Sequence, residues 1–198
     1  MKKFIFAMFL MIFCSAVFAA PKEIIIIRHG DKLSQPNPGP CLSPNGIMRS
    51  IEFAFYFLKK FGEPDFIFAT DPAREDSSIR ELQTVAPLAN MLASKHPDSG
   101  FPILHPFVSK DYAKLAADLL QNKEYQNKTV LVCWNHTKIP QLAQELGVTQ
   151  PIKKWHSEDF DSVYVLEFDS QGKMQKFTRL KDQYPLASDS SWEKLQKG

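Results

Sequence analysis

The chain alternates between short apolar runs and longer amphipathic stretches, a pattern that predicts strands separated by helices. Residues 24–27 are four consecutive isoleucines with no polar face, which is typical of a central parallel strand covered by helices on both sides. Shorter apolar runs predict strands at 66–69 and 129–134 and a short one at 102–105. These four segments account for the parallel part of a sheet.

Helix boundaries between these strands are marked by capping residues. Ser43 and Pro44 predict an N-cap followed by proline at the first helical position. That helix is expected to run to about Phe61 and to end at Gly62. Three more helices are expected, at about 78–94, 109–122 and 139–146.

The starts of the second and third helices carry polar signals of their own. Ser78, with Glu81 three residues later, predicts a capping box. Ser109 is the expected cap of the next helix. Gly147 is expected to end the last one.

The C-terminal part of the pattern completes the fold class. Residues 163–168 and 174–179 flank the turn sequence Asp-Ser-Gln-Gly, which predicts a β-hairpin. Strands alternating with helices predict an α/β three-layer sandwich, in which a mostly parallel central sheet carries helices on both faces. The hairpin would form an antiparallel edge. No internal repeat or long linker divides the sequence, so residues 20–198 are expected to form one domain.

The N-terminus has the pattern of a secretory signal peptide. Lys2 and Lys3 precede an apolar run at 4–13, and small residues follow up to a cleavage site after Ala19. The run is shorter than the roughly 20 residues that a spanning helix needs. We therefore expect a signal peptide at 1–19 and an exported protein, periplasmic or secreted, with no membrane attachment after cleavage. Lipidation at Cys14 is disfavoured by the bulky Phe13 before it.

Charge and cysteine content change the picture only a little. Without the two signal lysines, 22 of the 24 basic residues remain against 22 acidic ones, and no basic run suits nucleic acid. Cys41 and Cys133 remain after processing. Export permits a disulfide between them, but two cysteines make no disulfide framework, and two buried, inert thiols are the favoured interpretation.

Three segments carry histidine or arginine side chains and directly follow predicted strands or open a helix. Ligands of α/β sheets bind beyond the carboxyl ends of the strands, so these segments are expected to meet. Arg28-His29-Gly30 follows the first strand, Arg80 lies in the first turn of a helix, and His136 follows the 129–134 strand.

Each of these residues suits a phosphoryl group. Arginine has a planar fork that matches phosphate oxygens, and a helix N-terminus favours anions. A neutral imidazole at His29 can attack phosphorus, and Gly30 lets a ligand come close. His136 can donate to an equatorial oxygen as charge builds there. Two histidines and two arginines at one sheet edge would surround the phosphoryl group.

Together these motifs resemble the histidine phosphatase superfamily, the phosphoglycerate mutase-like group. The resemblance rests on Arg-His-Gly after the first strand, Arg-x-x-Gln-Thr opening a later helix and a late histidine after a strand, in order from about residue 23 to 168. Segments 110–116 and 134–140 are similar to a little-characterised subset, here with an export signal. The resemblance implies that His29 becomes phosphorylated, that Arg28, Arg80 and His136 complete the pocket, and that no metal or other cofactor takes part.

The chain departs from the family pattern at the acid that protonates the leaving group. Thr137 follows the second histidine where glycine or aspartate is usual, and no glutamate stands where the mutases have theirs. Asp111 is the nearest match and the expected catalytic acid, although in a first helical turn it would also complement the helix dipole. Asp31 is the next candidate.

The sequence thus predicts an exported phosphatase acting on phosphomonoesters of a small molecule or a phosphoprotein. A non-catalytic phosphate-binding or host-interaction module is the alternative from another class. A phosphoglycerate mutase is disfavoured because its glycolytic substrate is cytoplasmic. A zinc site from His29, Cys133 and His136 is disfavoured because the two arginines would repel the cation. Substrate and oligomeric state stay open.

Overall fold

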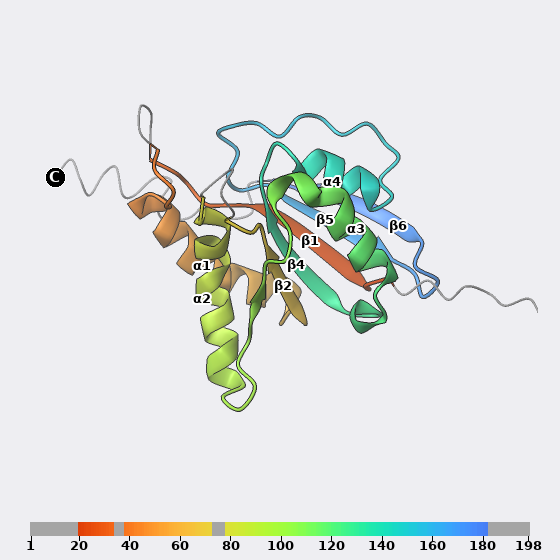
Figure 1. The fold of residues 1–198 in the computed structure, drawn as a ribbon, viewed down its shortest axis with the longest axis horizontal. Coiled ribbons are helices and arrows are strands. Elements are labelled where there is room, and N and C mark those ends of the chain that lie inside the picture. Colours follow the sequence, from red (N-terminus) through yellow and green to blue (C-terminus); the bar gives the residue numbers. More distant parts are fainter. Residues whose placement is uncertain (1–19, 34–37, 73–77, 182–198) are drawn as a thin grey trace, which may run out of the picture.

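A computed structural model describes residues 20–33, 38–72 and 78–181. The expected signal peptide at 1–19 and the C-terminal residues 182–198 lie outside the described residues. The described strands form a six-stranded sheet in the order β3-β2-β4-β1-β5-β6 (Figure 1). The strands are β1 (Glu23–Arg28), β2 (Phe66–Ala69), β3 (Ile103–Leu104), β4 (Thr129–Trp134), β5 (Val163–Phe168) and β6 (Met174–Leu180). The helices are α1 (Pro44–Phe61), α2 (Arg80–Lys95), α3 (Tyr112–Gln121) and α4 (Ile139–Glu145), with 3-10 turns at Ser109–Asp111 and Lys123–Tyr125.

The sheet is parallel in one part and antiparallel in the other. β3, β2, β4 and β1 run parallel, and β5 and β6 form the antiparallel hairpin at the edge. The expected mostly parallel sheet with an edge hairpin is confirmed. One detail differs: β1 has a parallel neighbour, β4, but its other neighbour is the antiparallel β5, where Ile27 pairs with Val163.

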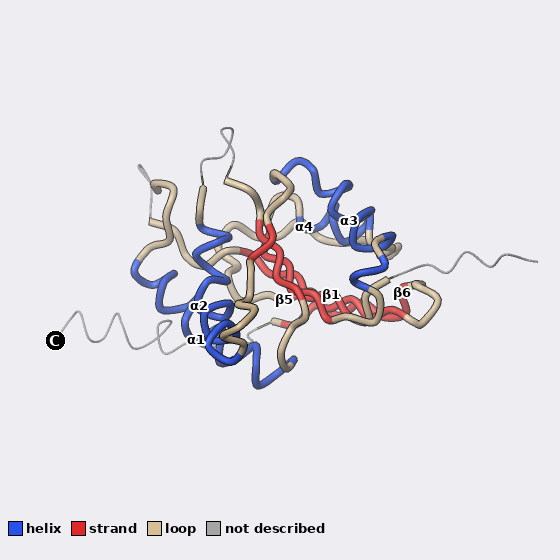
Figure 2. The backbone as a smooth tube through the Cα atoms, turned by 60° about the horizontal axis from the view of Figure 1, so that its bottom comes forward, coloured by secondary structure: helices blue, strands red, loops and turns tan. Residues whose placement is uncertain are grey.

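The isoleucine run of β1 divides between two hydrophobic cores. Ile25 and Ile27 pack with α1 and α2, whereas Ile24 and Ile26 pack with α3 and α4. Figure 2 shows the two helix pairs on opposite sides of the strands. All four isoleucines are buried, and each contributes about 1.5–3 kcal/mol of burial free energy. This explains why β1 has no polar face.

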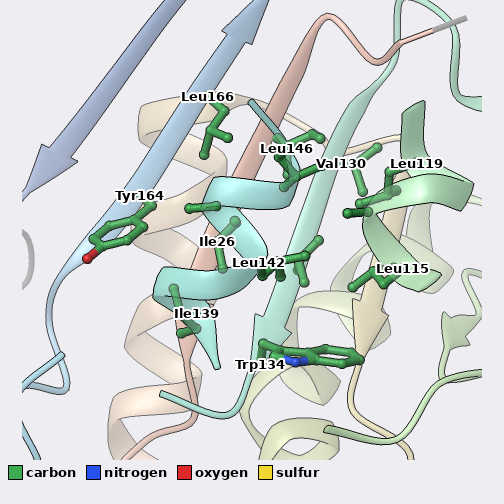
Figure 3. Close-up of a cluster of buried hydrophobic side chains, with 14 of the residues drawn as sticks. Ile26, Leu115, Leu119, Val130, Trp134, Ile139, Leu142, Leu146, Tyr164 and Leu166 are labelled. Atoms are coloured by element: carbon green, nitrogen blue, oxygen red, sulfur yellow. The ribbon is translucent and has the colours of Figure 1, made fainter. Parts of the chain in front are cut away.

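The core under α3 and α4 ends near the carboxyl end of β4. Trp134 lies there beside residues of both helices, and its indole Nε1 donates to the Ser109 carbonyl at 3.2 Å (Figure 3). The last residue of β4 is thereby held in place, and with it the segment that follows.

Helix starts agree with the sequence at α1 and differ at α2 and α3. Ser43 Oγ accepts from the Gly46 N–H at 3.1 Å, and Gly62 ends α1 as expected. α2 begins at Arg80 with Ile79 as N-cap, so the expected capping box at Ser78 is wrong. The Ser109 cap is also wrong, because Ser109 begins a 3-10 turn and α3 starts only at Tyr112.

The two cysteines are free thiols, Cys133 buried and Cys41 exposed. The structure therefore contains no bridge between them, and only Cys133 fits the expectation of a buried thiol. None of the helices in the described ranges is long and apolar enough to cross a membrane.

Two glycines let the segment after β1 lie directly against the start of α1. The Ser43 N–H donates to the Asp31 carbonyl at 2.9 Å. A Cβ atom on Gly46 would lie 2.2 Å from that same carbonyl oxygen, and one on Gly30 would lie 3.0 Å from the Gly46 oxygen. Only glycine fits at position 46 without a shift of the backbone.

We expect Gly46→Ala to lower the free energy of unfolding, by about 1–3 kcal/mol, because the new methyl group overlaps the Asp31 carbonyl. Helix propensity alone predicts the opposite sign, since alanine is favoured over glycine by about 1 kcal/mol. Urea unfolding at neutral pH measures the difference. The control is Asn45→Ala at the exposed neighbouring position, expected within about 0.5 kcal/mol of wild type. A Gly46→Ala protein more stable than wild type would contradict the close approach.

Candidate active site

The four residues expected to bind phosphate come to one edge of the sheet. His29 directly follows β1 and His136 follows β4, and these strands are parallel neighbours with Arg28 opposite Trp134. The two imidazole rings lie edge to face, with centroids 6.4 Å apart. Arg80, the first residue of α2, is close enough for its charge to act on His29.

His29 is buried, and a backbone carbonyl determines which of its ring nitrogens carries the proton. Only 3% of the residue is exposed, and Nδ1 lies 2.6 Å from the Gly30 carbonyl oxygen. A carbonyl only accepts, so Nδ1 carries the proton and Nε2 carries the lone pair. Burial, and next the positive charge of Arg28, lower the pKa of His29 from 6.5 to about 3. The imidazole is therefore neutral and nucleophilic at physiological pH.

Arg28 is a buried cation of which only the Nη1 donors are in use. Its Nη1 donates to the carbonyl oxygens of Ser157 at 2.5 Å, Asp159 at 3.2 Å and His156 at 3.4 Å. Its Nε and Nη2 are buried and have no hydrogen-bond partner among the described residues. Burial lowers the pKa of Arg28 to about 10, which still leaves it charged at neutral pH. Unpaired buried donors are costly, so the site is built to receive an anion.

The carbonyls around Arg28 come from the segment at 151–162. Residues 155–159 of this segment are a candidate for the rim of the site, but no motif in the sequence supports that placement. Because β5 is antiparallel to β1, the segment that enters β5 reaches the same sheet edge at which β1 ends. Phe160 of this segment stacks over the Arg28 guanidinium at 4.0 Å, and its ring lies 6.2 Å from that of His29. Backbone carbonyls carry no signal of residue type, so only the antiparallel pairing of β5 with β1 reveals this contribution.

Side-chain contacts fasten this segment to the hairpin. The Asp159 carboxylate accepts from Arg179 of β6 at 2.6 Å and from the Ser162 hydroxyl at 2.7 Å. The Trp155 indole donates to the Asp159 carbonyl at 2.8 Å. The Asp159 carbonyl therefore accepts from both Trp155 and Arg28, while the contacts of its carboxylate keep the residue in place.

Arg80 and His136 are the other two residues of the group, and they differ in their hydrogen bonding. The Arg80 guanidinium donates to the carbonyls of Gly39 and Cys41, with 3.3 Å for the latter. His136 Nδ1 is buried and has no partner within the described part of the chain. Burial, and next Arg28, lower the pKa of His136 to about 4, so it is neutral near pH 7.

The Gln-Thr pair of the Arg-x-x-Gln-Thr motif has a structural part. Thr84 Oγ1 accepts from the Gly30 N–H at 2.9 Å and donates to the Arg80 carbonyl at 2.7 Å. Gln83 accepts from the Leu42 N–H at 2.8 Å. These bonds tie the first turns of α2 to the segment that carries His29.

The two candidate acids from the sequence are both held by neighbouring cations. Asp111, at the end of the Ser109–Asp111 turn, pairs with Lys114 at 2.9 Å. Asp31 pairs with the buried Arg49 at 2.5 Å. Their catalytic use stays a prediction.

Two cavities differ in their relation to this site. A small polar pocket of about 90 Å³ adjoins it and shares Arg80 with it. Its lining residues are Thr70, Asp71, Ser78, Arg80, Glu81 and Asn135. A larger cavity of about 1050 Å³ lies along β3 and is lined by none of the four phosphate-site residues. In the described ranges no group of three or more His, Cys, Asp or Glu side chains is placed to hold a metal ion.

Comparison with known proteins identifies the fold. No family model and no curated protein matches the chain. Among solved structures, phosphoglycerate mutase from Plasmodium falciparum is 16% identical with a TM-score of 0.51, over 80% of this chain and 91% of that chain. The protein histidine phosphatase SixA, complexed with tungstate, is 19% identical with a TM-score of 0.48, over 80% and 96%. Phosphoserine phosphatase from Entamoeba histolytica is 18% identical with a TM-score of 0.47, over 81% and 98%.

Identities this low show the fold and leave the activity open. The chain has the α/β fold of the histidine phosphatase superfamily, as its motifs led us to expect.

The lowered pKa of His29 predicts how stability changes with pH. The unfolded state takes up a proton below pH 6.5 and the folded state only near pH 3, so stability is lost as pH falls between these values. At pH 4 this loss is about 3 kcal/mol relative to pH 7. His29→Asn, which keeps a donor for the Gly30 carbonyl, should lack this part of the loss. Urea unfolding of both proteins at pH 7, 5.5 and 4 measures it, and parallel pH profiles would contradict the burial of a neutral His29.

Proposed function

We propose that this chain, which has the histidine phosphatase fold, is an exported phosphatase that hydrolyses phosphomonoesters through a phosphohistidine at His29. The observation that carries the proposal is the presence, in one site, of a neutral, buried His29 and of the buried Arg28, whose Nε and Nη2 have no hydrogen-bond partner among the described residues. The first supplies a lone pair for phosphorus and the second supplies donors for phosphate oxygens.

The reaction follows in two steps. His29 Nε2 attacks phosphorus while Nδ1–H stays bonded to the Gly30 carbonyl, which stabilises the positive charge that develops on the ring. Arg28, Arg80 and His136 take the equatorial oxygens, and the bond to the leaving oxygen breaks. Water then attacks phosphorus, the P–N bond breaks, and phosphate is released. The arginines neutralise the phosphate charge in a site from which water is largely excluded.

A non-catalytic phosphate-binding module would use the same arginines but has no need of a neutral nucleophile. Phosphate binding alone is favoured by a charged imidazole, whereas burial and Arg28 hold the pKa of His29 at about 3. A neutral imidazole favours attack on phosphorus, whereas a charged one would favour binding of phosphate alone. The neutral state of His29 therefore supports the catalytic function over the binding module. A phosphoglycerate mutase remains the weaker candidate, because an exported protein would not meet its glycolytic substrate.

We expect His29→Ala to lower phosphate release from p-nitrophenyl phosphate by at least about 10³-fold, because the nucleophile is lost. The matched control is His96→Ala, an exposed histidine at the end of α2, which should keep wild-type turnover. Rapid quenching of the wild type with labelled substrate should trap acid-labile phosphate on His29. Wild-type turnover in the His29→Ala protein would show that another group is the nucleophile.

Export is tested separately. A protein expressed with its first 19 residues in a Gram-negative host should appear in the periplasmic fraction with Ala20 as its first residue, as read by N-terminal sequencing. Ala19→Arg removes the small residue at the cleavage site and should leave the full-length chain uncut. Cytoplasmic retention of the full wild-type chain would contradict export.

A further inference from the structure

The small polar pocket beside the site is lined by a buried acid, Glu81, whose charge also acts on Arg28. Glu81, the second residue of α2, is 3% exposed, and its Oε2 lies 3.3 Å from the Ser78 hydroxyl. Carboxylates in a first helical turn are favoured by the helix dipole, but that effect works equally well at the surface. Glutamate is rarely buried this completely.

A second group in the same pocket points independently to a ligand. Thr70 is 4% exposed, and its Oγ1 is buried without a hydrogen-bond partner in the ranges that the structure describes. Thr70 directly follows β2 and lines the pocket with Glu81. A buried hydroxyl without a partner costs about 1–3 kcal/mol, which a bound polar group would offset.

The position of the pocket relative to His29 suits the binding of a leaving group. Thr70 follows β2 and Asn135 follows β4, so the pocket lies between the ends of these two strands, whereas His29 follows β1 on the other side of β4. Phosphoryl transfer needs the attacking and leaving oxygen or nitrogen roughly in line through phosphorus. A nucleophile from the β1 side therefore directs the leaving group towards the β2 side.

We propose that this pocket receives the leaving alcohol of the phosphomonoester and that Glu81 is the general acid that protonates it; the inference rests on the proposed function. The pocket volume of about 90 Å³ has room for about three water molecules, so it suits a small polar aliphatic alcohol. Asp71, at the more exposed side of the pocket, would accept a hydrogen bond from a second hydroxyl or an ammonium group of that alcohol.

The proton and electrons balance over the two steps. As His29 Nε2 bonds to phosphorus, the P–O bond to the alcohol breaks and the Glu81 carboxyl transfers its proton to the leaving oxygen, which departs as a neutral alcohol. The Glu81 carboxylate then takes a proton from the water that attacks phosphohistidine. The P–N electron pair returns to Nε2, and the enzyme is restored with its acid protonated.

The other candidate acids are less well placed for this role. The Asp111 carboxylate is engaged by Lys114 and the Asp31 carboxylate by Arg49. Neither residue lines the pocket. Asp71 lines it, but its side chain is 37% exposed and lies 3.8 Å from His105.

The test compares Glu81→Gln with wild type on two substrates that differ in their need for an acid. Glycerol 2-phosphate releases an alkoxide that must be protonated, and kcat/KM for it should fall by at least about 10²-fold. p-Nitrophenyl phosphate releases a stable anion, and its kcat/KM should fall by no more than about fivefold.

Four further variants complete the experiment, among them Asp111→Asn, which should show no selective loss on the alkyl substrate. Glu145→Gln makes the same change at an exposed position at the end of α4 and should affect neither substrate. Glu81→Asp keeps a carboxyl group and should recover part of the alkyl phosphate activity. Thr70→Val should raise KM for glycerol 2-phosphate more than for the aryl substrate, because only the polar alcohol bonds to the hydroxyl.

The outcomes separate this inference from the proposed function. An equal loss on both substrates in Glu81→Gln, or a selective loss in Asp111→Asn instead, would overturn the role of Glu81. In either case acid-labile phosphate still forms on His29 from the aryl substrate. A wild-type protein that never carries phosphate on His29 would overturn the proposed function, and the leaving-group pocket with it.

Discussion

Parallel hydrogen bonding between β1 and β4 places Arg28 opposite Trp134, and through it His29 beside His136. A shift of one residue in this register would move the two histidines by about 3.3 Å relative to each other. The isoleucine run does not specify the register, because β1 is apolar on both faces and a shift would leave the same residue type in each core. Contacts at the strand end tie the segment after β1 to α1 and α2: the approach of Gly46 to Asp31 and the bond from Gly30 to Thr84.

Exclusion of water does two things at this strand end. It disfavours a charged imidazole, so His29 keeps its lone pair at neutral pH, and it strengthens the attraction between Arg28 and any anion that enters. Burying Arg28 is tolerated because three backbone carbonyls and the Phe160 ring surround one side of its guanidinium. The other side is left with donors that a phosphoryl group can use.

β4 separates two chemically different regions of the same sheet edge. On the β1 side lie the neutral histidine and the buried arginine. On the β2 side lies a pocket with a buried glutamate and a threonine hydroxyl that has no partner in the described part of the chain. Arg80 belongs to both, because it lines the pocket and its charge acts on His29. The antiparallel β5 adds a third contribution, since the segment that leads into it covers Arg28.

The sequence by itself determined the order of strands and helices, the cap at Ser43 and the group of Arg28, His29, Arg80 and His136. These are properties of local periodicity, of capping chemistry and of residues that follow strand ends. It could not determine that Ile79 rather than Ser78 is the N-cap of α2, since Glu81 has the same spacing in a capping box and in a pocket. Nor could it assign the carbonyls of 156–159 to Arg28, because any residue type supplies a carbonyl. Only the tertiary structure, through the pairing of β5 with β1 and the burial of Glu81, decided what surrounds the four residues.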